Sequence, residues 1–180
     1  WAYKIKKTNV ILNHWSAIKN SVSKILSFQN FKNAGIPTPD WTLAKSVALD
    51  WSRDGYWVCC RETDHGYDGY GLVLAKKPSE IVFASLYTKY IEAKEEFRVY
   101  IFKGELLDLL YKYPTEDIKN QIIRTETNGW EYGRSSYKVS KDKIEIAAAA
   151  IKANGMDFGG VDIIKNKKGD LFVLETNSEP

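Results

Sequence analysis

The stretch that decides the fold is GGVDIIKNKKGDLFVLETN, residues 159–177. Two apolar segments flank a polar turn with an asparagine and a glycine, which predicts a β-hairpin. Asp162 interrupts the first strand, and Glu175 and Asn177 end the second on one face, because they are two residues apart. If the turn brings Asp162 opposite them, three oxygen ligands converge on one spot, which suits Mg²⁺. The alternative is a strand end with solvated carboxylates.

The composition is that of a folded protein, with 180 residues of which 44% are hydrophobic and 27% charged. This length holds one ordinary domain or two small lobes. The net charge of +3 comes without a long run of like charges, so a nucleic-acid partner is not indicated, although a basic surface suits an anionic ligand. No membrane-length apolar run or signal-peptide pattern is present, so we expect a cytoplasmic protein without a membrane partner. The oligomeric state is not indicated.

The two cysteines, Cys59 and Cys60, are adjacent in an apolar segment at 56–61. Neighbours on a strand face opposite sides, so we expect two reduced thiols in a reducing compartment and no disulfide. The alternative is a vicinal redox switch, which the absence of a Cys-x-x-Cys motif disfavours.

The expected elements come in runs of helices and runs of strands, which favours an α+β fold over strict βαβ alternation. Residues 1–20 are mixed and are expected to be the tail of a preceding region or a linker. Helices are expected at 23–34, 45–53, 79–86 and 141–154, and strands at 40–44, 56–61, 72–76, 87–92, 96–103 and 105–113, before the final hairpin. The segment 114–136 is expected to be rich in loops.

A loop at 62–71 contains glycines, among them Gly66 and Gly69, that let a hairpin tip present backbone N–H groups to phosphate. The alternative is an ordinary flexible hairpin. Arg61 ends the preceding apolar strand, where an unpaired charge is costly, so we expect it to meet an anion. Lys24, taken alone, is expected to be a solvated surface lysine.

A second charged group is expected on the strands at 96–103 and 105–113. Glu96 and Arg98 are two apart and share a strand face, with a structural Glu–Arg pair as the alternative reading. Lys112 on the next strand is expected to project into the same cleft. No Rossmann or Walker glycine motif is present, so any nucleotide site has another architecture.

The order of these parts resembles the ATP-grasp enzymes, in particular carboxylate–amine ligases such as ribosomal-protein glutamate ligases and D-alanine–D-alanine ligases. The resemblance covers roughly residues 20–180, and its most specific part is the terminal Asp…Glu-x-Asn element. The matching pieces are Ser23-Lys24 before AGIPTP at 34–39, VCCR at 58–61 before the glycine loop, KYIE at 89–92 before EFRV at 96–99, and GVD at 160–162 before ETN at 175–177 and Pro180.

The resemblance implies an ATP-grasp fold, in which two α+β lobes hold the nucleotide between them. The N-terminal lobe would span residues 21–88, and the C-terminal lobe, with the metal site, residues 89–180. Asp162, Glu175 and Asn177 would bind Mg²⁺ as two ions, with Glu175 bridging them.

The resemblance also implies roles for the other polar residues. Arg98 and Lys112 would be catalytic, facing the γ-phosphate and the acyl-phosphate formed from it. The residues that would contact the nucleotide are Lys24 and Arg61 at the phosphates (with arginine where lysine is usual), Gly66 and Gly69 in the loop, Lys89, Tyr90 and Ile91 at the adenine, Glu96 at the ribose, and Arg124 near the phosphates. Lys89 replaces an acidic residue that is common in the family.

The implied function is an ATP- and Mg²⁺-dependent ligase that joins a carboxylate substrate to an amine acceptor, either a small molecule or a peptide, through an acyl-phosphate. The alternatives are an ATP-grasp kinase for a small molecule and a nucleotide-binding module without catalysis. Residues 1–20 are too few for the preceding α/β domain that is usual in the family. We therefore expect either a fragment or a trimmed enzyme.

Overall fold

The computed structural model describes residues 11–65, 68–135 and 139–179. The chain forms two compact units, here called unit 1 (Trp1–Thr38, Ala93–Tyr113 and Tyr132–Pro180) and unit 2 (Pro39–Glu92 and Pro114–Glu131). The division into lobes at residues 20 and 88, which the resemblance implies, stays a prediction. Segments of the two units alternate along the chain, because strands that are distant in sequence pair with one another in each sheet.

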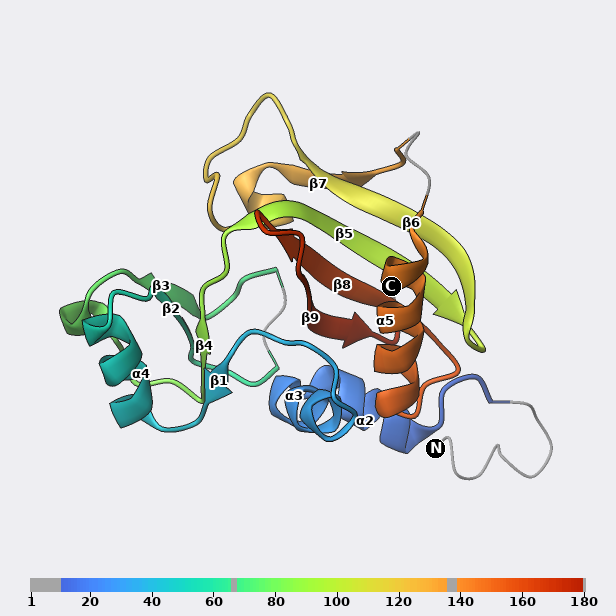
Figure 1. The fold of residues 1–180 in the computed structure, drawn as a ribbon, viewed down its shortest axis with the longest axis horizontal. Coiled ribbons are helices and arrows are strands. Elements are labelled where there is room, and N and C mark those ends of the chain that lie inside the picture. Colours follow the sequence, from blue (N-terminus) through green and yellow to red (C-terminus); the bar gives the residue numbers. More distant parts are fainter. Residues whose placement is uncertain (1–10, 66–67, 136–138, 180) are drawn as a thin grey trace. The chain divides into compact units, whose positions relative to one another are not determined.

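Unit 1 is built on a five-stranded antiparallel sheet in the order β7-β6-β5-β8-β9 (Figure 1). Its strands are β5 (Ala93–Phe102), β6 (Glu105–Pro114), β7 (Trp130–Gly133), β8 (Phe158–Asn166) and β9 (Leu171–Asn177). β8 and β9 pair antiparallel across the turn, so the predicted hairpin is confirmed. β7 lies inside the segment that was expected to be loop.

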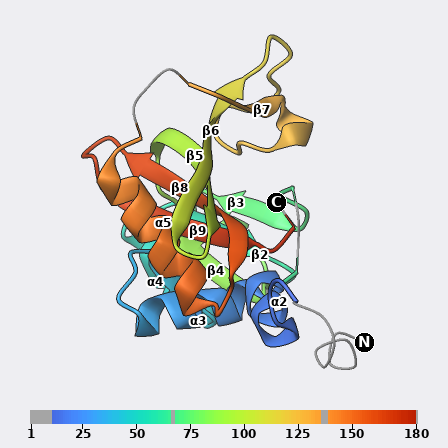
Figure 2. The ribbon, with the colours of Figure 1, turned by 90° about the vertical axis from the view of Figure 1, so that its right-hand side faces the viewer.

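Helix α5 (Lys141–Ala153) packs across one face of this sheet, against β5, β8 and β9 (Figures 1 and 2). The side chains that fill this layer are fully buried: Phe97, Val99, Ile101, Ala147, Ala150, Val161, Ile163 and Val173. Because strand neighbours point to opposite faces, the polar residues that alternate with them, such as Arg98 and Asp162, lie on the face away from α5.

Two helices flank β9 in unit 1, namely α2 (Trp15–Val22) and α3 (Lys24–Asn33). The predicted helix after Ser23 is confirmed, since the Ser23 hydroxyl accepts a hydrogen bond from the Leu26 N–H and Gly35 follows the helix at φ +68°. α2 was not predicted. Its N-terminal cap is His14, whose ring accepts from the Ser16 N–H, and histidine is not among the usual capping residues.

Unit 2 contains a four-stranded antiparallel sheet in the order β1-β4-β2-β3, covered by helix α4 (Lys45–Arg53). The strands are β1 (Trp41–Thr42), β2 (Val58–Arg61), β3 (Leu72–Ala75) and β4 (Leu86–Lys89). The core between helix and sheet is formed by Ala48, Val58, Cys60, Ala75, Ile81, Ala84 and Tyr87. The helix predicted at 45–53 and the strands predicted around residues 56–61 and 72–76 are therefore confirmed.

The helix predicted at 79–86 was wrong. Only a short 3-10 turn, η1 (Pro78–Glu80), forms before the chain becomes extended and enters β4. The buried hydroxyl of Tyr87 accepts a hydrogen bond from the Ala84 N–H at 2.9 Å and donates to the Val82 carbonyl at 3.1 Å. These bonds satisfy backbone groups in a non-helical conformation, so the side chain of the next strand outweighs the local helix signal.

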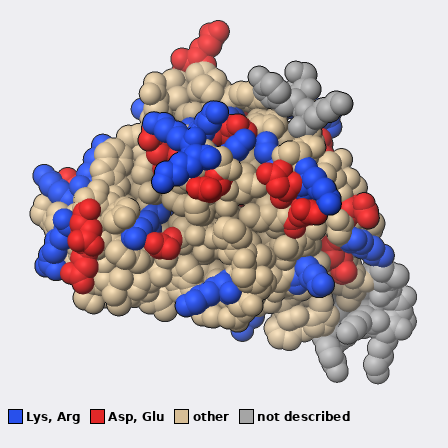
Figure 3. Space-filling model, viewed as in Figure 1, with Lys and Arg blue, Asp and Glu red and all other residues tan. Residues whose placement is uncertain are grey.

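Acidic and basic side chains lie next to one another over the face of the protein shown in Figure 3, without one extended area of a single sign. Within the described residues, no helix combines the length and the apolar character needed to cross a membrane.

Candidate functional site

The three predicted metal ligands come together on the face of the unit 1 sheet that points away from α5. Asp162 of β8 and Glu175 of β9 are directly paired across the hairpin, and the strand register shifts just beyond Asp162. The Asn177 amide nitrogen lies 3.4 Å from the Asp162 Oδ2. The predicted convergence is therefore observed, while a metal at this place stays a prediction.

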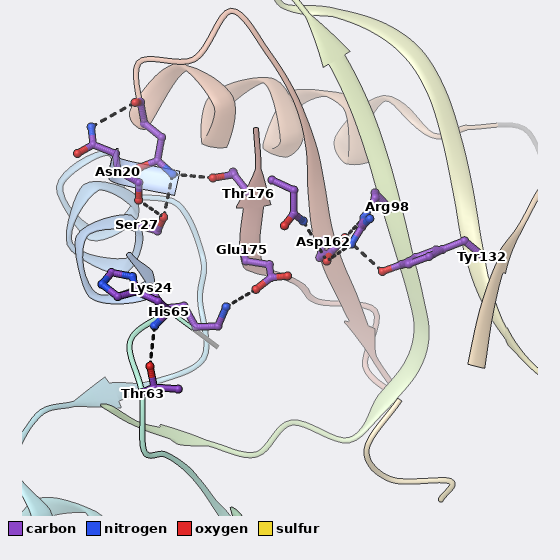
Figure 4. A network of polar contacts seen from close by, with 12 residues as sticks. Asn20, Lys24, Ser27, Thr63, His65, Arg98, Tyr132, Asp162, Glu175 and Thr176 are labelled. Atoms are coloured by element: carbon purple, nitrogen blue, oxygen red, sulfur yellow. Dashed lines mark hydrogen bonds and ion pairs between the residues drawn. The ribbon is translucent and has the colours of Figure 1, made fainter. Parts of the chain in front are cut away.

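Arg98 of β5 forms a two-pronged ion pair with Asp162, in which Nε donates to Oδ1 at 2.6 Å and Nη2 to Oδ2 at 2.8 Å (Figure 4). The alternative reading, a structural Glu96–Arg98 pair, is wrong, because the partner of Arg98 is Asp162. Burial lowers the pKa of Arg98, but the hydrogen bond and charge of Asp162 outweigh it, so the pKa is raised and the guanidinium stays protonated.

The Asp162 side chain is 9% exposed, and burial raises its pKa. The hydrogen bond from Arg98 opposes this rise, whereas the negative charge of Glu175 adds to it. The two carboxylates are thus close enough to repel each other. A divalent cation relieves such repulsion, and in this structure Arg98 pairs with Asp162 and Lys24 with Glu175.

Lys24, the first residue of α3, donates to the Glu175 Oε2 at 2.6 Å, with its side chain only 11% exposed. The prediction of a solvated surface lysine was therefore wrong. The helix begins beside β9 because Ser23 caps it there, and this start places the lysine against the strand that carries Glu175.

Lys112 of β6 donates to the Glu96 Oε1 at 2.9 Å, and both side chains are nearly buried. Both Lys112 and Arg98 contact the ring of Tyr132, with Lys112 Nζ 5.0 Å and Arg98 Cζ 4.6 Å from its centroid. The expectation that Lys112 and Arg98 face the same place is therefore confirmed.

Tyr132 itself was missed, because its strand β7 lies in a segment that was expected to be loop. Its hydroxyl donates to the Asp162 Oδ1 at 3.3 Å (Figure 4). Burial raises the pKa of Tyr132, and the negative charge of Asp162 raises it further, so the phenol is a neutral donor at neutral pH. The strand WEYG at residues 130–133 carries the aromatic signal that could have indicated it.

A buried amide, Asn154, holds β9 in place from the opposite face. Its Nδ2 donates to the Thr176 hydroxyl at 2.7 Å and to the Ser27 hydroxyl at 3.0 Å, and its Oδ1 accepts from Asn30 at 2.9 Å. Thr176 lies between the two polar residues of β9 that face the site, so this amide fixes their backbone. Sequence reasoning missed it because Asn154 directly follows the last residue of α5 and resembles an ordinary helix end.

In unit 2, Arg61 is the last residue of β2, and its Nε is buried without a hydrogen-bond partner in the described part of the chain. An unpartnered buried donor is costly, so an anion at this guanidinium is a physically reasonable expectation.

The predicted adenine segment follows β4, and part of its hydrogen-bonding capacity is already used. The Lys89 N–H donates to the Asp40 carbonyl and the Tyr90 N–H to the Trp57 carbonyl, at 2.9 and 2.8 Å. The Lys89 ammonium pairs with the Asp40 carboxylate at 2.9 Å. An adenine contact here would therefore use other groups of residues 89–91, including those of Ile91.

The glycine loop of unit 2 is tied to the segment 114–131. The Asp68 carboxylate accepts from the N–H groups of Glu126 and Thr127 at 2.9 and 3.3 Å. Gly69 has φ +75°, and a Cβ there would lie 2.8 Å from the Thr125 side chain, so only glycine fits. Gly66 lies outside the described residues.

Three further residues of unit 2 were named in the sequence predictions, one arginine and two cysteines. The Arg124 guanidinium stacks over the Trp130 ring, 4.6 Å from its centroid. Cys59 and Cys60 are both free thiols, as predicted, and burial raises the pKa of each.

The donor set in unit 1 fits Mg²⁺. No group of three or more His, Cys, Asp and Glu side chains suited to a metal occurs among the described residues, so this candidate site rests on two carboxylates and one amide. Magnesium is commonly held by one or two protein carboxylates, with water and substrate phosphates completing its octahedron. A half-turn of the Asn177 amide would present its oxygen in place of the nitrogen.

Comparison with known proteins supports the predicted class. No family model matches the chain. It is 28% identical over 192 residues to a probable α-L-glutamate ligase of Haemophilus influenzae, an alignment that covers 97% of this chain and 60% of the relative. The chain therefore spans about three fifths of the length of this curated relative.

Solved structures establish the fold. D-alanine–D-alanine ligase from Bacillus anthracis superposes with a TM-score of 0.75 at 16% identity, over 99% of this chain and 64% of the other. The ATP-grasp ligase PsnB gives a TM-score of 0.74 at 17% identity, over 97% and 57%. The chain has the α+β ATP-grasp fold. The predicted resemblance to ATP-grasp carboxylate–amine ligases is confirmed by these likenesses together with the curated relative.

Proposed function

We propose that this chain is the nucleotide- and metal-binding part of an ATP- and Mg²⁺-dependent carboxylate–amine ligase. The observation that carries the proposal is the pair of facing carboxylates, Asp162 and Glu175, each held by a largely buried cation in an ATP-grasp fold. Related solved structures support it, since PsnB has been solved with Mg and ADP, and the Bacillus anthracis ligase with ATP.

Asp162, Glu175 and Asn177 would hold Mg²⁺, two ions by the family resemblance, and Glu175 would be the ligand they share. Bound Mg²⁺ would neutralise charge on the phosphoryl group that is transferred. Arg98 pairs with Asp162 and Lys24 with Glu175 in this structure. In the proposal both cations would also attract the phosphate oxygens of the nucleotide.

The proposed nucleotide contacts fall on the phosphates, the adenine and the ribose. The buried, unpartnered Nε of Arg61 and the largely buried Lys24 support phosphate contacts. The further proposed contacts are Gly66 and Gly69 of the glycine loop, Lys89, Tyr90 and Ile91 at the adenine, Glu96 at the ribose, and Arg124 near the phosphates. The lobes proposed for the whole site are residues 21–88 and 89–180.

Arg98 and Lys112 are the proposed catalytic cations. A substrate carboxylate oxygen would attack the γ-phosphorus, the bond from that phosphorus to the bridging oxygen would break, and ADP would leave. An amine would then attack the acyl carbon, lose a proton and expel phosphate, which leaves an amide. Both cations act by positioning and by stabilising developing negative charge, so no nucleophilic side chain is required.

The substrate classes follow from the relative's name. We propose L-glutamate as one substrate, joined to a small molecule or a peptide, because the curated relative is described as a probable α-L-glutamate ligase. A cytoplasmic location remains a prediction from the sequence.

The test is turnover by the chain with ATP, MgCl₂, L-glutamate and a panel of carboxylates and peptides. ADP and free phosphate are measured by chromatography, and the amide by mass spectrometry. Arg98→Ala is expected to lower turnover by about 100-fold or more, as the loss of a transition-state charge partner does. Arg53→Ala, at an exposed ion pair on α4, is the matched control. A stable phosphorylated product would indicate a kinase instead, and binding without turnover a non-catalytic module.

A further inference from the structure

Three groups of the proposed site meet at one side chain that the family resemblance does not assign. The Tyr132 ring has the Arg98 guanidinium 4.6 Å and the Lys112 ammonium 5.0 Å from its centroid. The hydroxyl at the far end of the same ring donates to the Asp162 Oδ1 at 3.3 Å. Figure 4 shows Tyr132 directed from β7 toward the pair formed by Arg98 and Asp162.

We propose that Tyr132 is a positioning residue, whose ring holds Arg98 and Lys112 in place for an incoming anionic group. This inference rests on the proposed function for what the anion is. Each cation also has a carboxylate partner: Arg98 pairs with Asp162 at 2.6 Å, and Lys112 with Glu96 at 2.9 Å. A bound metal or nucleotide would compete for those carboxylates but not for the ring face. The contacts of both cations with the ring would therefore persist.

Each cation keeps its contact with the Tyr132 ring when its carboxylate binds another group. A guanidinium that loses a two-pronged carboxylate contact becomes free to rotate about several side-chain bonds. Stacking on an aromatic face restrains the plane of the guanidinium without neutralising its charge. Arg98 would therefore keep both its orientation and its full positive charge for the phosphoryl group, and Lys112 its charge beside it.

The ring and the hydroxyl of Tyr132 can be separated by substitution. Tyr132→Phe keeps the ring and removes the hydrogen bond to Asp162, whereas Tyr132→Leu removes both. Tyr113→Leu is the control, because Tyr113 is an aromatic residue at the end of the neighbouring strand β6 and is 41% exposed. It lies outside the proposed machinery.

The first measurement follows the Arg98 side chain by ¹⁵N-resolved NMR of arginine Nε–H groups, and the Arg98 signal is assigned from its loss in Arg98→Lys. Spectra are recorded without nucleotide and again with Mg²⁺ and the non-hydrolysable analogue AMPPNP. In wild type and Tyr132→Phe the Arg98 signal is expected to stay slowly exchanging and ordered in both conditions. In Tyr132→Leu it is expected to broaden or to exchange rapidly when the analogue is present. An Arg98 signal in Tyr132→Leu as ordered as in wild type would overturn the proposal.

The second measurement separates this inference from the proposed function. Turnover in Tyr132→Leu is expected to fall by about 10- to 30-fold in kcat with little change in the KM for ATP, the factor that a desolvated cation–π contact is worth. An equal effect of Tyr113→Leu would mean that only general packing is involved, and would overturn the inference. If the wild-type chain bound no Mg²⁺-nucleotide, the proposed function would fail. The positioning role would then be decided without ligand in Asp162→Ala, where Arg98 lacks its carboxylate partner: it stands if Arg98 stays ordered in Asp162→Ala and becomes disordered when Tyr132→Leu is added, and falls if the added substitution changes nothing.

Discussion

Replacing Arg98 with methionine tests the electrostatics on which the account depends. Methionine keeps much of the apolar stem of arginine but removes the charge that pairs with Asp162, whose side chain is 9% exposed. Among the described residues, the remaining hydrogen-bond donors to that carboxylate are the Tyr132 hydroxyl at 3.3 Å and the Asn177 amide at 3.4 Å, both neutral and at long distance, while the charge of Lys112 also acts on it. Removing one partner of a buried ion pair costs about 3 to 5 kcal/mol in the free energy of unfolding. Because these donors still contact the carboxylate, we expect a loss at the low end of that range, about 3 kcal/mol.

The assay is urea unfolding followed by tryptophan fluorescence, with Arg98→Met, Asp162→Asn and the double variant forming a cycle. The expected coupling energy between the two sites is about 2 kcal/mol or more. Arg53→Met is the control, because its pair with Asp50 has both side chains more than 60% exposed, at 64% and 65%, and should contribute less than about 1 kcal/mol.

The pH dependence follows from the same pair. Burial already raises the pKa of Asp162 in the folded protein, and loss of Arg98 raises it further, so the folded variant holds, over a wider pH range than wild type, a proton that the unfolded chain releases. The free energy of unfolding of Arg98→Met is therefore expected to approach that of wild type as the pH falls toward about 4. A loss below about 1 kcal/mol at pH 7 would refute the reasoning, because it would mean that the carboxylate is not a buried, paired anion.

Three further predictions concern other parts of the chain. Gly159→Ala is expected to lower the free energy of unfolding by about 1 to 3 kcal/mol, because a Cβ would lie 2.7 Å from the Asn177 carbonyl; an unchanged urea midpoint would contradict it. Asn154→Leu removes the hydrogen bonds to Thr176, Ser27 and Asn30 at a buried position and is expected to cost about 2 to 4 kcal/mol in the same assay, and a stable variant would show that the amide network is dispensable. Burial raises the pKa of Cys59 and Cys60, so the folded state keeps protons that the unfolded chain loses near pH 8.5. The stability contribution is present below that pH and declines as the pH rises; fast reaction of the native thiols with a disulfide reagent at pH 8 would disprove it.

The sequence predicted the hairpin and its three polar residues well because the signal is local. Asp162 interrupts an alternating apolar strand, and the spacing of Glu175 and Asn177 fixes their common face. The short turn sets Ile163 opposite Val173, but only the register shift beyond Asp162 brings Glu175, and not Leu174, opposite Asp162, and the local sequence does not predict that shift.

The partners of these residues could not be predicted in the same way. Lys24 is 151 residues from Glu175 along the chain, and nothing in its own neighbourhood indicates burial. Taken alone it resembled any lysine at a helix start, and only the packing of α3 beside β9 shows otherwise. Tyr132 lay in a segment whose strand is too short to stand out among loops.

The secondary-structure prediction failed where a tertiary contact outweighed the local preference for helix. The region 79–86 has a proline and a serine suited to a helix start, but the hydroxyl of Tyr87 takes up its backbone hydrogen bonds in an extended form. The interleaved units were also beyond local reasoning, because strand pairing over long sequence separations decides them.

The most direct test of the central claim is calorimetric titration of AMPPNP into the chain, with and without MgCl₂. We predict binding that requires Mg²⁺ and weakens at least about tenfold in Glu175→Gln, a variant that can still accept a hydrogen bond from Lys24. Glu105→Gln, at the exposed start of β6, serves as the control and should bind as wild type does. Absence of binding to the folded wild-type chain, or binding that is indifferent to both Mg²⁺ and Glu175, would contradict the account.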